Sequence, residues 1–162
     1  MQEIQLMINN DQPTLIDNEG NKYWYRNMLL HRDNDLPALI HWRGKKLWVK
    51  NGELHIENDQ PAIIDDNQKW WYQNGQIHRN NDQPAIIDND GRKWWYQNGE
   101  LHRNNDQPAI INKNGSQFWY NNGKLHRENY RPAVIRGNGQ FEWYINGVKQ
   151  KDGELDADYI KG

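Results

Sequence analysis

Five histidines recur at regular intervals in this 162-residue sequence, and they are the first residues that suggest chemistry. The intervals are 24, 23, 24 and 24 residues, and the series is His31, His55, His78, His102 and His126. Imidazole is a common metal ligand and titrates near neutral pH, so this series could form a metal-binding or acid–base ladder. Four of the five histidines are followed directly by arginine, which places a row of cations beside them.

A second recurring group is an aspartate that precedes Gln-Pro, at Asp59, Asp82 and Asp106. A carboxylate of this kind could act as a catalytic acid or base. Aspartate also forms turns by hydrogen bonding to its own backbone two residues on. Because an active site is rarely built several times over, the recurrence favours the turn.

Other signs of catalysis are absent from the sequence. It has no Gly-x-Ser-x-Gly, no P-loop and no His-Glu-x-x-His motif, and no cysteine. Thr14 and Ser116 are its two hydroxyl residues of the serine and threonine type, so a Ser/Thr nucleophile is not expected. We therefore expect a protein that is not an enzyme, with no cofactor and no metal.

The elements that position these residues come from an internal repeat. All six prolines fall in one series with steps of 24, 24, 23, 24 and 24 residues. Tryptophan and Asn-Gly recur in phase with proline, and the clearest unit runs from Asp106 to Arg127. The proline series is Pro13, Pro37, Pro61, Pro84, Pro108 and Pro132.

Each unit reads as two strands separated by turns. Residues 84–87 form a short apolar run, and residues 93–96 are rich in strand-forming aromatic residues. Gly91 supplies a turn between them, and Asn98-Gly99 is the strongest short hairpin signal. The predicted fold is all-β, an elongated single-layer antiparallel meander of about six 24-residue hairpin repeats. A β-solenoid with one coil per repeat is the alternative.

The repeat also explains an unusual composition. Hydrophobic residues make up 35% of the chain and its mean hydropathy is -1.21, yet it contains nine Trp and eight Tyr. A lone unit is too small to fold, so burial must be shared between neighbouring units. We predict one repeat domain over 1–162, with an N-terminal cap strand at 1–12, repeats at 13–147 and a C-terminal cap at 148–162.

The two architectures differ in what the histidines can bind. In the meander, equivalent residues lie two strands apart, about 9.6 Å, whereas zinc needs its ligand nitrogens within ~2.1 Å of one ion. Neighbouring histidines then cannot share a metal. In the solenoid they would lie ~4.8 Å apart, and this objection weakens. We expect His102 to fold the loop and to brace Asp106.

The aromatic residues divide between two faces of the strand, because neighbouring side chains point to opposite faces. Trp71 and its equivalents are constant and are expected to pack. The preceding position varies, and on the more exposed face it would provide a binding row that includes Trp70, Trp94 and Phe118. The alternative is that these rings cover one another along the sheet. The varying series is Tyr23, Leu47, Trp70, Trp94, Phe118 and Glu142.

The arginines beside the histidines are the second candidate row, with Arg79, Arg103 and Arg127 as its central members. They could meet phosphate or carboxylate groups of a ligand. They could also pair with nearby aspartate and glutamate.

At this point the repeat resembles a known family. The segment 96–102, Tyr-Gln-Asn-Gly-Glu-Leu-His, is similar to the centre of a MORN repeat, and the likeness covers about residues 5–148. MORN repeats follow the histidine with Gly-x-Gly, whereas this chain has His-Arg-x-x-Asp-x-Pro-Ala, a variant seen in bacterial and large-virus proteins. The resemblance implies a sheet of hairpins with a role in scaffolding, protein contact or lipid headgroup contact, without catalysis. Choline- and glucan-binding wall repeats are similar in combining Trp-Tyr with a following glycine, but their units are shorter.

Net charge and hydropathy limit the classes of partner that the sequence predicts. The pI is about 6.3, so nucleic acid is not an expected partner. No run of ~18 apolar residues predicts a membrane span, and the first residues lack the features of a signal peptide, so we expect a cytoplasmic protein. The predicted function is a scaffold that binds another macromolecule, most simply a protein. The alternative is a small-ligand binder that uses the His-Arg row for anionic headgroups or glycans.

Overall fold

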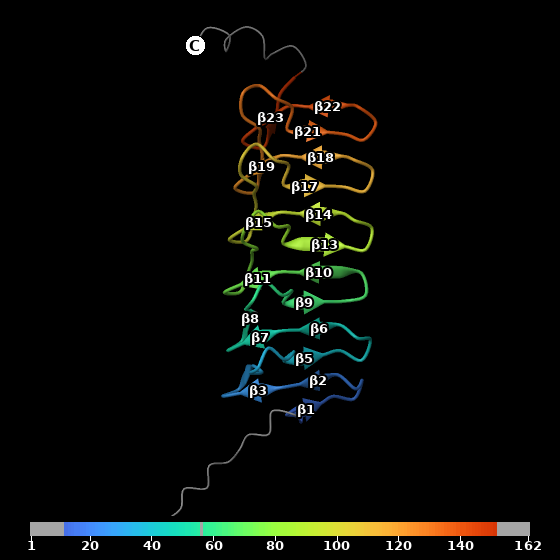
Figure 1. Cartoon of the computed structure of the whole chain (residues 1–162), viewed down its shortest axis with the longest axis vertical. Coiled ribbons are helices and arrows are strands. Elements are labelled where there is room, and N and C mark those ends of the chain that lie inside the picture. The colour runs from blue at the N-terminus through green and yellow to red at the C-terminus, as the bar shows by residue number, and fades with distance from the viewer. Residues whose placement is uncertain (1–11, 56, 152–162) are drawn as a thin grey trace, which may run out of the picture.

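The computed structural model describes residues 12–55 and 57–151. In this part of the chain, the regular elements are β-strands, which stack as a ladder along the long axis of the molecule (Figure 1). The strands of the main sheet pair antiparallel with their neighbours in sequence order along that axis. The predicted antiparallel meander is therefore confirmed in place of the solenoid. Most of the two predicted caps, 1–12 and 148–162, lies outside the described residues.

The main sheet is a single layer of twelve strands, two from each repeat. They are, in spatial order, β1 (Leu15–Ile16), β2 (Lys22–Tyr23), β5 (Leu39–Ile40), β6 (Lys46–Leu47), β9 (Ile63–Ile64), β10 (Gln68–Trp70), β13 (Ile86–Asp88), β14 (Lys93–Trp94), β17 (Ile110–Ile111), β18 (Gln117–Phe118), β21 (Val134–Ile135) and β22 (Phe141–Glu142).

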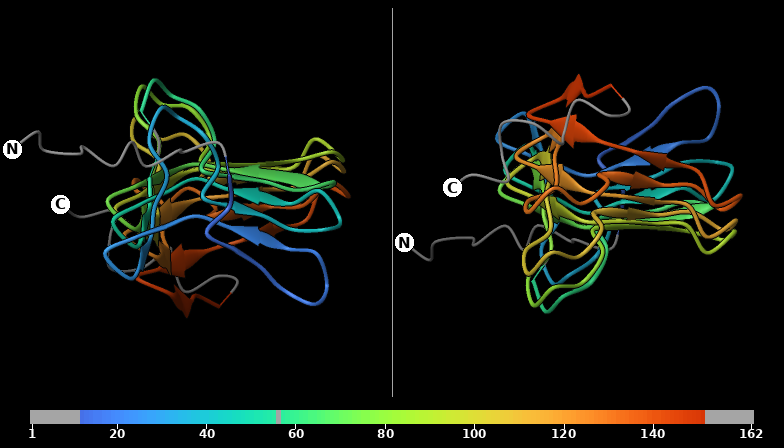
Figure 2. Two further views of the ribbon diagram at one scale, coloured as in Figure 1. Left: turned by 90° about the horizontal axis from the view of Figure 1, so that it is seen from below. Right: turned by 90° about the horizontal axis from the view of Figure 1, so that it is seen from above.

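A row of short hairpins stands across one side of the main sheet, which is clearest in the views along the long axis (Figure 2). Each repeat contributes one hairpin of two strands. The pairs are β3 (Tyr25–Arg26) with β4 (Leu29–Leu30), β7 (Val49–Lys50) with β8 (Glu53–Leu54), β11 (Tyr72–Gln73) with β12 (Gln76–Ile77), β15 (Tyr96–Gln97) with β16 (Glu100–Leu101), β19 (Tyr120–Asn121) with β20 (Lys124–Leu125), and β23 (Tyr144–Ile145) with β24 (Val148–Lys149).

The predicted strand at 93–96 is divided at Trp95, so a repeat has four short strands where the sequence suggested two. The Trp95 N–H donates to the Ala109 carbonyl of the next repeat at 2.8 Å, and the Trp95 carbonyl accepts from the His102 N–H at 3.1 Å. The two groups thus bond in different directions, one toward the next repeat and one within the hairpin. This residue is where the chain leaves the main sheet and enters the hairpin.

The hairpin turns follow the sequence closely. Asn98 and Gly99 have φ of 49° and 85°, and two consecutive positive values define the type I′ turn that Asn-Gly favours. Asn81 and Asp82, in the loop before the next strand, also have positive φ, at 58° and 53°. Asparagine and aspartate tolerate this conformation better than most residues, which explains why they recur there.

The buried core of each repeat is small and lies beside the bend. Trp71 and Trp95 are buried, as are the alanines that follow five of the six prolines, whose exposed fraction is 0%. A side chain larger than methyl has no space at these positions. The alanine series is Ala38, Ala62, Ala85, Ala109 and Ala133.

We expect Ala109→Leu to lower the free energy of unfolding by about 1–3 kcal/mol, because it overpacks a closed site. Urea unfolding followed by circular dichroism would measure the change. Met28→Leu is the matched control, since Met28 is 97% exposed and should change stability by less than about 0.5 kcal/mol. Equal effects of the two substitutions would contradict a closed core at Ala109.

Candidate functional site

The register of the main sheet gathers apolar residues on one of its faces, here called the apolar face. Trp70 pairs with Ile86, and Ile86 pairs with Trp94, so these three side chains lie on the same face. The row continues through every strand of the sheet and is polar at one end. Its members are Leu15, Tyr23, Leu39, Leu47, Ile63, Trp70, Ile86, Trp94, Ile110, Phe118, Val134 and Glu142.

The opposite face alternates isoleucine with lysine over most of its length. Lys69 pairs with Ile64 on one side and Ile87 on the other, and Lys93 pairs with Ile87 and Ile111. The lysines are exposed, whereas the isoleucines between them are half-buried. The two faces therefore differ in charge, and the aromatic rings are concentrated on the apolar face.

Tyrosines of the hairpin row extend the apolar face around the bend. The rings of Tyr23 and Tyr25 stack with centroids 6.2 Å apart, and the Tyr144 hydroxyl donates to Glu142 at 3.1 Å. Tyr96 pairs with Leu101 in its hairpin. We call the surface formed by the apolar face and these hairpin residues the inner corner. The hairpin members are Tyr25, Val49, Tyr72, Tyr96, Tyr120 and Tyr144 with their partners Leu30, Leu54, Ile77, Leu101, Leu125 and Lys149.

The environment of these tyrosines is partly dehydrated. Burial raises the pKa of the Tyr72, Tyr96 and Tyr120 hydroxyls above their ordinary value, because the ionised form loses hydration. Trp70, Trp94 and Phe118 on the adjacent strands are half-buried. The predicted binding row thus lies on a surface where neighbouring rings shield one another in part.

Charged groups close the C-terminal end of the inner corner. Glu142 accepts from Lys149 at 3.0 Å and from Arg136 at 2.6 Å. These contacts, with Lys149 the larger influence, lower the pKa of Glu142 to about 2. The apolar row therefore stops at an ion-pair cluster.

The arginines of the second predicted row lie on the other side of the bend, between consecutive repeats. The Arg103 guanidinium stacks on the Trp95 ring at 3.9 Å from its centroid. Its Nε and Nη2 each donate to the Asp82 carboxylate at 2.8 Å, and its Nη1 donates to the Pro108 carbonyl at 3.4 Å. When repeats are counted from one proline to the next, Asp82 belongs to the repeat before that of Arg103, so this arginine attaches one repeat to the next.

The same arrangement occurs at Arg79 and Arg127, and we call it the Trp–Arg–Asp brace. Arg79 stacks on Trp71 at 3.9 Å and donates to Asp59 at 2.7 and 2.8 Å. Arg127 stacks on Trp119 at 3.8 Å and donates twice to Asp106 at 2.9 Å. The side chains of the three arginines are 13–14% exposed. Of the two uses considered from the sequence, pairing with nearby carboxylates is the one these residues have.

The tryptophan of each brace also fixes the loop of the preceding repeat. The Trp119 indole N–H donates to the Asp106 backbone carbonyl at 3.0 Å. Trp71 and Trp95 make the same bond to Asp59 and Asp82, also at 3.0 Å. Sequence reasoning missed this bond, although the shared phase of tryptophan and aspartate was its signal.

The histidines form a further connection between repeats. His102 Nδ1 accepts from the Asn122 N–H of the next repeat at 3.2 Å, so its proton is on Nε2, which lies 2.9 Å from Asn104 Oδ1. We expected His102 to brace Asp106, but Asn104 takes its Nε2 while Arg127 takes the Asp106 carboxylate. Among the described residues, no three His, Asp or Glu side chains are close enough to hold a metal ion.

The structure thus separates the predicted site residues into two groups. Trp70, Trp94 and Phe118 lie together on the apolar face. The three arginines stack on the tryptophans that follow these positions in sequence, whose side chains point the opposite way. The aromatic row and the arginine row are therefore not one site.

Comparison with known proteins adds no assignment. No protein-family model matches the sequence, and no curated protein sequence matches it. In the described part of the chain, there is no helix with the length and apolar character to cross a membrane.

We expect Trp95→Ala to lower the free energy of unfolding by about 3–5 kcal/mol, because it removes a buried ring together with the stacking surface of Arg103. Trp42→Ala, at a loop tip where the ring is 54% exposed, should cost much less. Chemical unfolding of both variants would measure the difference, and a small effect at Trp95 would contradict its role in the core.

We expect stability to fall in acid because the brace carboxylates must be protonated. The hydrogen bonds from Arg79, Arg103 and Arg127 lower the pKa of their aspartates below 3.8. A lowered folded-state pKa means that the unfolded chain binds more protons. The contribution is therefore complete above about pH 5 and is lost as the pH falls through 3.8 toward the lowered values.

The triple variant Asp59→Asn, Asp82→Asn, Asp106→Asn tests this expectation. It should lose about 0.2–1 kcal/mol per pair at pH 7, since these partly exposed pairs are screened by solvent, and its stability should depend less on pH below 5. The control is Glu53→Gln, Asp66→Asn, Glu100→Gln, which leaves the braces intact. An unchanged acid slope in the Asp triple variant would count against the braces.

Proposed function

We propose that this chain is a non-enzymatic repeat scaffold that binds a protein partner through the inner corner. One observation carries the proposal: aromatic and aliphatic side chains align in register on a single face of a single-layer sheet. In the described part of the chain, the six two-stranded hairpin sheets stand at one side of the main sheet, and no sheet is stacked over this face (Figure 2). Half-buried rings of this kind offer large contact area at little cost in side-chain entropy.

Three features support a protein in preference to a small ligand. The rows of the inner corner run the length of the array, which suits an extended partner surface. Ile86 lies between Trp70 and Trp94 in the register of the sheet, so the three side chains form a continuous apolar strip. The resemblance of the unit to MORN repeats, which implies scaffolding and protein contact, points in the same direction.

The alternative function uses the His-Arg row for anionic headgroups or glycans. It requires each guanidinium to leave a stacked ring, a carboxylate and a backbone carbonyl, as at Arg103. The geometry therefore favours the inner corner.

The test is a pull-down from native cells that compares the wild-type protein with the double variant Trp70→Ala, Trp94→Ala. We expect the variant to lose at least nine-tenths of the captured partner while its circular dichroism spectrum and cooperative melting persist. All braces should remain in the variant, because the brace arginines stack on Trp71 and Trp95 and not on Trp70 or Trp94.

Two further variants test whether the loss of capture is specific to the inner corner. Trp42→Ala removes an exposed ring at a loop tip and should leave capture unchanged. Arg79→Ala, Arg103→Ala tests the alternative, in which binding is lost with the arginines and weakens with salt. If the Trp70, Trp94 variant captures its partner normally, or simply unfolds, the inner corner is not the binding site.

A further inference from the structure

Three tyrosines of the inner corner carry hydroxyl groups that the fold does not use. Tyr72, Tyr96 and Tyr120 have no hydrogen-bond partner for their hydroxyls in the described part of the chain. The last tyrosine of the row, Tyr144, donates instead to Glu142 at 3.1 Å. Burial raises the pKa of the three unpartnered hydroxyls, so they stay protonated and remain hydrogen-bond donors.

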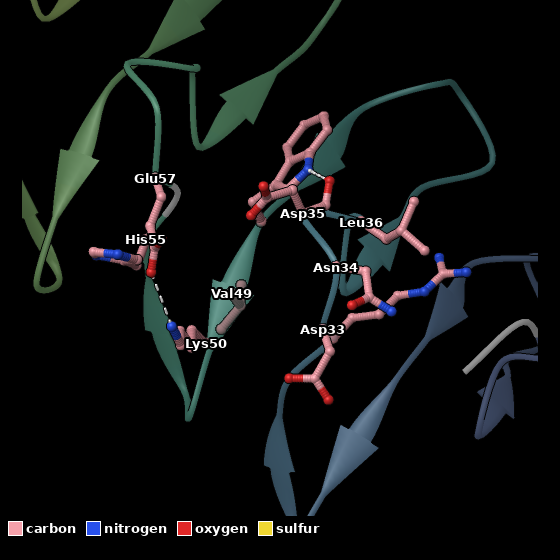
Figure 3. Close-up of a pocket in the computed structure, with 10 residues that line it drawn as sticks. Asp33, Asn34, Asp35, Leu36, Val49, Lys50, His55 and Glu57 are labelled. Atoms are coloured by element: carbon pink, nitrogen blue, oxygen red, sulfur yellow. Dashed lines mark hydrogen bonds and ion pairs between the residues drawn. The ribbon is translucent and has the colours of Figure 1, made fainter. Parts of the chain in front are cut away.

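The row of unpartnered hydroxyls begins at the third repeat. At the equivalent position the second repeat has Val49 on β7, which Figure 3 shows beside Lys50 and which carries no polar group. Tyr72, Tyr96 and Tyr120 belong to consecutive repeats, so their hydroxyls form an uninterrupted series.

This hydroxyl row runs beside the aromatic rings of the apolar face. Tyr96 follows Trp94 by two residues, and the other two tyrosines have the same relation to Trp70 and Phe118. The Trp94 indole N–H is also without a hydrogen-bond partner among the described residues, whereas the Trp70 indole donates to Gln68 at 2.8 Å. Each of these repeats thus presents one ring of the main sheet and one tyrosine hydroxyl to the inner corner.

The rings and the hydroxyls repeat at one interval along the array. Trp70 and Trp94 lie on either side of β13, so they are two strand spacings apart, which is about 9.6 Å. Phe118 follows Trp94 at the same interval across β17. The strands succeed one another in a column along the long axis (Figure 1). A ligand chain that lies along this axis therefore meets the same groups once per repeat.

Among the common regular backbone conformations, polyproline II fits this interval best. It has about three residues per turn and rises ~3.1 Å per residue, so one of its sides recurs every ~9.3 Å. Two turns of an α-helix rise ~10.8 Å and would drift by ~1.2 Å at each repeat. One face of a β-strand recurs every ~6.6 Å, so a strand along the axis would turn opposite faces to successive repeats.

A polyproline II chain also suits the chemistry of the inner corner. It has no internal hydrogen bonds, so its carbonyl groups can accept from the tyrosine hydroxyls and from the Trp94 indole. Its prolines pack against aromatic rings, and their fixed φ lowers the conformational entropy that is lost on binding. The inner corner supplies both the rings and the donors.

Cations from the outer turns border the rings on the side opposite the hairpin row. The Lys45 ammonium lies 6.0 Å from the Trp70 ring centroid, and arginines lie near the next two rings. Those arginines, Arg92 and Arg136, pair with carboxylates of this chain. Lys45 has no ion pair within residues 12–55 and 57–151. An acidic residue at this end of a bound segment would provide one.

We propose that the inner corner binds a proline-rich segment of a partner protein in the polyproline II conformation, with an acidic residue beside its prolines. The prolines lie against Trp70, Trp94 and Phe118, and the carbonyl groups accept from the tyrosine row. This inference rests on the proposed function, because it names the kind of chain that the same surface binds. From β6 to β22 the sheet spans four intervals, ~38 Å, which is the length of about twelve residues of this conformation.

The test is a titration of ¹⁵N-labelled protein with a synthetic peptide of this length, followed through the indole N–H resonances. The peptide contains three Pro-Pro-Ala units and a further proline, with a glutamate at each end. We expect a saturable shift of the Trp94 resonance. We expect none at the tryptophans whose indoles bond to loop carbonyls beyond the bend, which are Trp71, Trp95 and Trp119.

Two further peptides test the period and the charge. A peptide of the same composition with its alanines made adjacent keeps the conformation but loses the three-residue period, and it should bind at least about tenfold more weakly. Replacing the glutamates by glutamine should weaken binding to the wild-type protein, and this difference should disappear in Lys45→Gln.

The triple variant Tyr72→Phe, Tyr96→Phe, Tyr120→Phe is the decisive change in the protein. It removes the hydroxyls and keeps every ring, and these hydroxyls have no partner to lose in the described part of the chain. We expect it to fold normally and to weaken peptide binding at least about tenfold. The control is Tyr130→Phe, in a loop outside the inner corner, which should leave binding unchanged.

The inference is overturned if the Trp94 resonance does not respond, if the peptide with adjacent alanines binds equally well, or if the triple variant binds like the wild type. Its failure can be told apart from failure of the proposed function. If the peptide does not bind but Trp70→Ala, Trp94→Ala still loses its captured partner, the inner corner binds a chain of another conformation. Normal capture by that double variant would overturn both.

Discussion

A sheet one layer thick has no second layer to bury its side chains, so consecutive repeats must hold one another. The Trp–Arg–Asp brace is where they do so. In the brace at Arg103, one guanidinium joins a ring of its own repeat, a carboxylate of the preceding repeat and the carbonyl of Pro108. Burial of the Trp95 ring and the position of the loop before it both depend on this arrangement.

The brace also determines which surfaces remain for function. Trp94 and Trp95 are adjacent and point to opposite sides of the chain. Because the second is used to attach repeats, the first is left on the apolar face with Ile86 and Ile110. The residues that join repeats and the residues of the apolar face thus alternate along the same strand, so one row can vary without disturbing the other.

Much of the fold could be predicted from the sequence, because its signals are local and recur in phase. Asn98-Gly99 specifies its turn by backbone conformation alone, and the alternation around Trp94 and Trp95 specifies two faces. The division of each strand at a tryptophan could not be predicted. It depends on the bond from the Trp95 N–H to Ala109, a contact between repeats that no local pattern encodes.

The candidate site shows the same limit. The aromatic row followed from alternation and is found on one face. The partners of the arginines and histidines could not be predicted from the sequence. Arg103 pairs with Asp82, 21 residues earlier, and His102 accepts a hydrogen bond from Asn122, 20 residues later. Either residue type has acceptable partners within its own loop, and only the stacking of whole repeats decides between them.

The direction of the backbone bonds has a mechanical consequence. Strands of the main sheet lie across the long axis, so their hydrogen bonds run along it (Figure 1). Tension applied between the two ends therefore opens one strand pair at a time instead of loading many in parallel. We expect the array to open repeat by repeat, because the Trp–Arg–Asp brace between two repeats must break before their strands can separate.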